Sequence, residues 1–171
     1  MLEPLTRRRA LATGLSGATA LALGPSAAAA AELDQGAALA ALVRAEQDAA
    51  FVYRTAGPGA DAAALARHEE EHARALASHL QALGLPLPGP TRSRSGLTSA
   101  ALAVLDAGGD GQRLRAGVAL ERALIAGCAA QLGRLGEPGI VRTVATVMAS
   151  HAQHLALLER AAGLDPLPSG G

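Results

Sequence analysis

Apolar and small residues recur every three or four positions over four long stretches of the chain, which is the spacing of one face of an α-helix. This pattern predicts helices at about 33–56, 61–83, 112–135 and 138–162, and a shorter helix at about 97–107. No stretch requires a β-strand. The aromatic content of 1% and the absence of Trp also favour helices, because β-sandwiches and barrels fill their cores with large flat residues.

Glycine and proline residues divide the predicted helices into two pairs. Gly57-Pro58-Gly59 separates the first long helix from the second, and Gly136-Glu137-Pro138 separates the third from the fourth. Because these turns are short, the helices of each pair must be antiparallel neighbours. About 27 residues join the pairs, enough to cross a bundle lengthwise. The expected fold class is all-α, with two antiparallel helical hairpins, a long crossover and a short extra helix.

The N-terminal segment is typical of an export signal. Thr6 and the pair Arg7-Arg8 precede an uncharged stretch that ends in a run of alanines at Ala31, and the pattern resembles the twin-arginine consensus. We expect a signal peptide at 1–31, one domain at 32–163 and a flexible tail at 164–171, with export to the periplasm, cell envelope or medium. General secretion is the alternative export route, and an uncleaved membrane anchor is the alternative to a signal peptide. Nothing after Ala31 is apolar enough for long enough to span a bilayer.

Charge and cysteine content exclude several classes of partner and site. The formal net charge is zero and the arginines are scattered, which argues against nucleic acid as a partner. The single cysteine excludes an internal disulfide framework and a Cys-rich zinc module. The sequence leaves open whether the chain forms a homo-oligomer.

Carboxylates and imidazoles stand in the middle of the faces that should form the core. They are Glu46, Glu69, His72, Glu121, His151 and His154. At about 1.5 Å per residue from each turn, the members of each hairpin come level, so we expect one shared cluster. Burying such groups without partners costs several kcal/mol each, and a metal ion would compensate them. The alternative is a network of ion pairs, which needs protonated histidines because no arginine lies on these faces.

This pattern resembles the ferritin-like family of di-iron and di-manganese carboxylate bundles, in which two helices give one Glu each and two give a Glu-x-x-His pair. The matching ligand positions are Glu46, Glu69, His72, Glu121 and His154. Tyr53 stands seven residues after Glu46, where ferritins commonly place a tyrosine. The resemblance covers the mature chain, is closest to exported bacterial ferritin-like domain proteins, and implies a ferritin-like four-helix bundle holding one or two ions of iron or manganese, with zinc a further choice.

His151 departs from that family, which has a bridging Glu at this position. A neutral imidazole offers one nitrogen to one metal, so this bridge is lost. One interpretation keeps two ions, the first on Glu46, Glu69 and His72 and the second on Glu121, His151 and His154. A second keeps one ion, and a third keeps none, the site having degenerated into a scaffold.

Other polar residues are weaker candidates for a site. We expect His79 to be a core or mouth residue, His68 to be solvated, and Cys128 to fill a small space in the core. The favoured function is an exported metal-binding protein that oxidises or sequesters iron or performs related redox chemistry. The alternative is a non-catalytic structural or interaction module, and the sequence leaves open whether the chain is an enzyme.

Overall fold

The computed structural model describes residues 27–164, and within this range it contains five helices and no strand. The helices are α1 (Ala27–Ala56), α2 (Ala62–Ala82), α3 (Ser99–Asp106), α4 (Asp110–Leu132) and α5 (Pro138–Ala161). The predicted all-α class is therefore confirmed. Most helix ends lie within three residues of the predicted ones.

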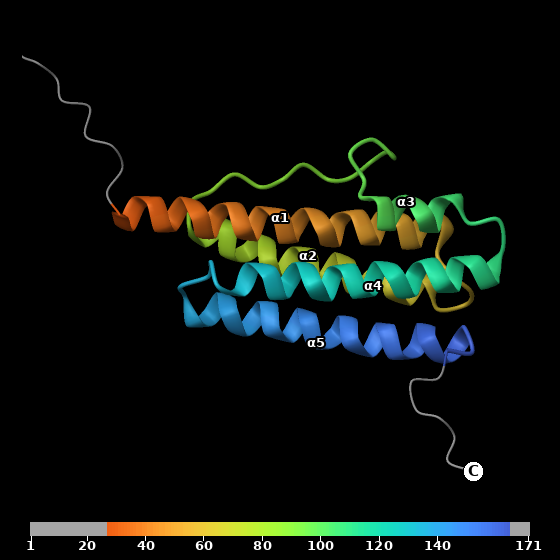
Figure 1. The fold of residues 1–171 in the computed structure, drawn as a ribbon. Coiled ribbons are helices and arrows are strands. Elements are labelled where there is room, and N and C mark those ends of the chain that lie inside the picture. Colours follow the sequence, from red (N-terminus) through yellow and green to blue (C-terminus); the bar gives the residue numbers. More distant parts are fainter. Residues whose placement is uncertain (1–26, 165–171) are drawn as a thin grey trace, which may run out of the picture.

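The four long helices lie side by side, and the short helix α3 lies over one end of α1 and α4 (Figure 1). Helix α1 packs along α2, and α4 packs along α5. These two pairs meet where α1 contacts α4 and where α2 contacts α5. The segment between α2 and α3 runs back along the outside of α1, which is how the chain passes from one pair to the other (Figure 1).

Glycine and proline residues stand at several ends of the long helices. Gly84 and Gly163 follow α2 and α5 with φ of 67° and 68°, a left-handed conformation that glycine adopts without a Cβ penalty. The next residue then bonds back across the last turn, Leu85 N–H to the Leu80 carbonyl and Leu164 N–H to the Glu159 carbonyl. Pro138 begins α5, where its missing N–H costs no helical hydrogen bond.

The core consists of two apolar clusters with polar groups between them. One cluster includes Val52, Tyr53, Leu65, Val118 and Leu158, and the other includes Leu39, Leu76, Cys128, Ile140 and Val144. Along every long helix, the predicted site residues come between members of the first cluster and members of the second. We call the six residues Glu46, Glu69, His72, Glu121, His151 and His154 the polar layer.

The described residues do not test the export prediction. Residues 1–26, which include Arg7-Arg8, lie outside the described residues, as does the tail at 165–171. Helix α1 starts at Ala27 rather than near residue 33, because the alanine run has the highest helix propensity and continues the helix. The export signal stays a prediction. None of the described helices is both long and apolar enough to cross a membrane.

Candidate metal centre

The four long helices bring all six residues of the polar layer together. Glu46 comes from α1, Glu69 and His72 from α2, Glu121 from α4, and His151 and His154 from α5. The three carboxylates and His151 are completely buried, and His154 is 3% exposed. His72 lies at the edge, with 14% of its side chain exposed. The expected convergence of these side chains is therefore present in the structure.

His151 lies at the centre and joins two carboxylates from different helices. Its Nδ1 is 2.8 Å from Oε2 of Glu121, and its Nε2 is 3.1 Å from Oε1 of Glu46. A third carboxylate oxygen, Oε2 of Glu69, is 3.8 Å from Nδ1. His151 thus connects α5 with α4 through Glu121 and with α1 through Glu46.

The other two histidines share the carboxylate of Glu69. Its Oε2 is 3.0 Å from Nδ1 of His72, and its Oε1 is 3.0 Å from Nδ1 of His154. His72 also approaches Oε2 of Glu46 at 3.4 Å, and His154 approaches Oε1 of Glu121 at 3.7 Å. Glu69 therefore connects α2 with α5 across the two helix pairs.

Two groups of four residues could each hold a metal ion. Within each group, every residue offers one ligand atom, and these four atoms all lie within 4.8 Å of one another. The first group is Glu46, Glu69, His72 and His151, and the second group is Glu69, Glu121, His151 and His154. The two-ion interpretation of the sequence assigned each residue to one ion, whereas in the structure Glu69 and His151 belong to both groups. Counting residues from a turn fixes the height of a side chain but not its neighbours across the bundle. As a result, each group has two carboxylates and two imidazoles.

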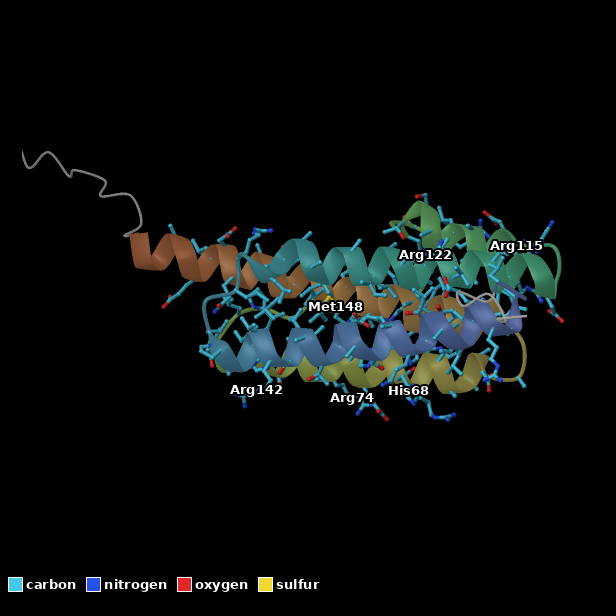
Figure 2. The ribbon with its side chains drawn as sticks, turned by 60° about the horizontal axis from the view of Figure 1, so that its bottom comes forward. His68, Arg74, Arg115, Arg122, Arg142 and Met148 are labelled. Carbon is cyan, nitrogen blue, oxygen red and sulfur yellow. The ribbon has the colours of Figure 1, made fainter. Side chains whose placement is uncertain are left out.

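Charge within the polar layer balances without a metal when its histidines are protonated. Burial alone would lower the pKa of these imidazoles, but the hydrogen-bonded carboxylates outweigh it and raise the pKa to about 9 for His72 and His154 and about 10 for His151. Burial would likewise raise the pKa of Glu46, but the hydrogen bond from His151 and the imidazole of His72, 3.4 Å away, lower it to about 2. Among the described residues, every ion pair of the three glutamates is with a histidine. Arg74 and Arg142 point outward from the molecule (Figure 2).

The donor atoms also fit a divalent metal ion. Oε2 of Glu46 is buried and has no hydrogen-bond partner. A buried carboxylate oxygen in this state is costly, and a cation beside it removes the cost. Carboxylate oxygens combined with imidazole nitrogens suit Fe(II), Mn(II) and Zn(II). The residues present therefore fit such an ion in either group.

Tyr53 belongs to the first apolar cluster and forms a hydrogen bond with the polar layer. Its hydroxyl donates a hydrogen bond of 2.5 Å to Oε1 of Glu121, which joins α1 to α4. Burial and the Glu121 carboxylate raise the pKa of Tyr53 well above its usual value, so the phenol keeps its proton. Glu121 thus accepts from Tyr53 through one oxygen and faces His151 through the other.

The three weaker candidates from the sequence, Cys128, His79 and His68, lie outside the polar layer. Cys128 is buried in the second apolar cluster, and burial raises its pKa to about 12, which agrees with a core-filling thiol. His79 is half-buried and its Nε2 is 2.9 Å from the Thr143 hydroxyl. His68 is exposed, but its Nδ1 also lies 3.0 Å from Nε2 of His154, and the rings stack.

The contact of His68 with His154 is one of the polar contacts that sequence reasoning missed (Figure 2 labels His68, on α2 next to α5). The signal was present in the spacing, because His68 precedes His72 by four residues and so lies at the edge of the same helix face. His154 therefore uses Nδ1 toward the carboxylates and Nε2 toward the surface histidine.

The raised pKa values predict how the stability of the metal-free protein depends on pH. The histidines titrate near 6.5 when unfolded and at about 9–10 when folded, so their stabilisation is complete below about pH 6.5 and is lost as pH rises through 9–10. We expect a loss on the order of several kcal/mol, seen as a falling unfolding midpoint in the presence of a chelator. His79→Gln should leave this profile unchanged. A midpoint that is constant from pH 6 to 10 would contradict the ion-paired layer.

Comparisons with known proteins identify a related fold and no family. No protein-family model matches the chain, and no curated protein sequence matches it. The crystal structure of a conserved hypothetical protein, Rv2844, from Mycobacterium tuberculosis is similar, with a TM-score of 0.66 and 14% identity. The match covers 82% of this chain and 99% of that one. At this identity, the similarity shows a shared fold and leaves the function to be argued from the polar layer.

Proposed function

We propose that this chain is a ferritin-like four-helix bundle that binds two divalent metal ions, iron or manganese, in the polar layer. The observation that carries the proposal is the pair of overlapping groups that share Glu69 and His151. Two ions that lie next to each other need two groups of ligands, and residues that belong to both groups keep the two ions adjacent. In the ferritin-like family the ligands likewise come from all four long helices.

The shared carboxylate replaces the bridge that His151 does not supply. Glu69 directs one oxygen toward each group, since Oε2 faces His72 and Oε1 faces His154. A carboxylate with its two oxygens in two groups can connect two ions, whereas each imidazole nitrogen serves one. This geometry favours the two-ion interpretation over the one-ion interpretation.

Bound iron or manganese would supply redox chemistry, and the protein residues would hold the ions and exclude bulk water. Such a centre suits iron oxidation, iron sequestration or a related oxygen-linked reaction. Export through the twin-arginine route fits this role, because that route carries folded proteins and lets a metal site load before export. The support for export is Arg7-Arg8 and the alanine run.

Metal analysis of protein purified without added metal tests the proposal. We expect bound iron or manganese, and anaerobic titration of the stripped protein with Fe(II) or Co(II) should give two equivalents. Because metal binding displaces protons from the histidines, affinity should fall as pH falls. His79→Gln is the matched control, since it removes an imidazole outside both groups. No binding at any ratio up to a large excess of metal would contradict the proposal.

A structural or interaction module is the second candidate, and one observation favours it. The three glutamates and three histidines pair with one another, so the layer can hold the two hairpins together without metal. The same titration separates the two candidates, because a purely structural layer binds no ion. Substitutions in such a layer would change the stability of the protein and nothing else.

A further inference from the structure

A cavity of about 200 Å³ lies beside the polar layer, between α1, α3 and α4. Aliphatic side chains form much of its wall, among them Leu42, Leu120 and Leu124. Its position follows from the fold, since α3 lies over the seam between α1 and α4 (Figure 1). No function described above uses this space.

Small residues on three helices leave the cavity open. Ala45 of α1, Ala101 of α3, and Ala123 and Gly127 of α4 all line it. A Cβ added to Gly127 would meet no atom within 4 Å, so the space beside this glycine is free. Ala123 and Thr98 are exposed and Gly127 is half-buried, so the cavity opens between α4 and the start of α3.

The inner wall of the cavity includes a residue of the proposed metal centre. Glu46 lines the cavity and belongs to the first group. The other polar residues of the wall already form hydrogen bonds within the fold. Asp48 accepts from the Thr91 hydroxyl, and Thr98 caps α3 by accepting from Ala101 N–H. The remaining wall therefore selects its occupant by apolar contact and size.

We propose that this cavity binds a small apolar organic molecule, about the size of benzene or slightly larger, and presents it to the metal centre beside Glu46. An apolar cavity of about 150 Å³ is already large enough to hold benzene. The binding itself depends only on the cavity, whereas its role as the substrate pocket of the centre rests on the proposed function.

Benzene binding to the metal-free chain tests the cavity. We expect benzene to raise the unfolding midpoint and to give saturable binding by NMR. Ala123→Leu and Gly127→Leu extend side chains at the mouth and should weaken benzene binding at least tenfold. Ala126→Leu is the matched control, because it adds the same side chain to the exposed face of α4 and should bind benzene as the unchanged chain does. No binding to the unchanged chain, or equal binding to all variants, would overturn the proposal.

Cobalt then tests whether the cavity serves the metal centre. We expect benzene to shift the visible absorption of the Co(II)-loaded chain, and Gly127→Leu to remove the shift while Co(II) stays bound. Benzene binding with an unchanged Co(II) spectrum would overturn the link to the centre. If the chain bound benzene but took up no Co(II), the cavity would be a true binding site. The proposed function, and with it the link to a metal, would then be wrong.

Discussion

Glu69→Gln is expected to abolish the binding of both proposed metal ions. This carboxylate belongs to both groups, and each of its oxygens is 3.0 Å from a different histidine. Loss of a partner that only orients a ligand typically costs 10–100-fold in metal affinity, so loss of a shared ligand should cost more than about 100-fold at each ion. The measurement is anaerobic titration with Fe(II) or Co(II), together with metal analysis after dialysis.

Two variants control for charge and position in this experiment. Glu46→Gln removes a carboxylate from the first group alone, so we expect it to weaken one ion and leave the other. Glu70→Gln changes the next residue of α2, which pairs with Arg54 away from the layer, and should leave both ions bound. If Glu69→Gln kept one ion at unchanged affinity, the two groups would be independent and the shared carboxylate would not be a bridge.

The fold follows closely from short-range features of the sequence. The three- and four-residue spacing marks the helices, and the glycines and prolines mark their ends, because both act within a few residues along the chain. The start of α1 was less well predicted. The alanine run before Glu32 has a composition that suits a cleavage region and a helix equally well.

The membership of the polar layer was predictable, but its internal contacts were not. Distance from a turn gives the height of Glu46 or Glu121 along its helix, and heights alone bring the residues level. The sharing of Glu69 and His151 depends on how α2 faces α5 and how α1 faces α4, which are long-range packing results. The contact between His68 and His154 was missed for the same reason, because it joins residues 86 positions apart.

His151→Glu is expected to weaken the metal-free protein and strengthen metal binding. The change replaces a layer of three carboxylates and three imidazoles by one of four carboxylates and two imidazoles. His151 now pairs with Glu121 and Glu46, and both would lose that partner and face a like charge. Breaking buried pairs in this way costs about 3–5 kcal/mol, which is a large part of the stability of a domain of this size.

Bound metal should reverse this loss, because two divalent ions neutralise four carboxylates fully and Glu offers two oxygens where His offers one nitrogen to an ion. We therefore expect Mn(II), measured by the rise in unfolding midpoint, to stabilise His151→Glu more than the unchanged chain. His151→Leu is the matched comparison, since it breaks the same pairs without adding a ligand and should gain less from Mn(II). If Mn(II) failed to stabilise any of the three proteins, the layer would be a structural network. In that case His151, whose imidazole pairs with two buried carboxylates, would serve to hold the bundle together by ion pairs.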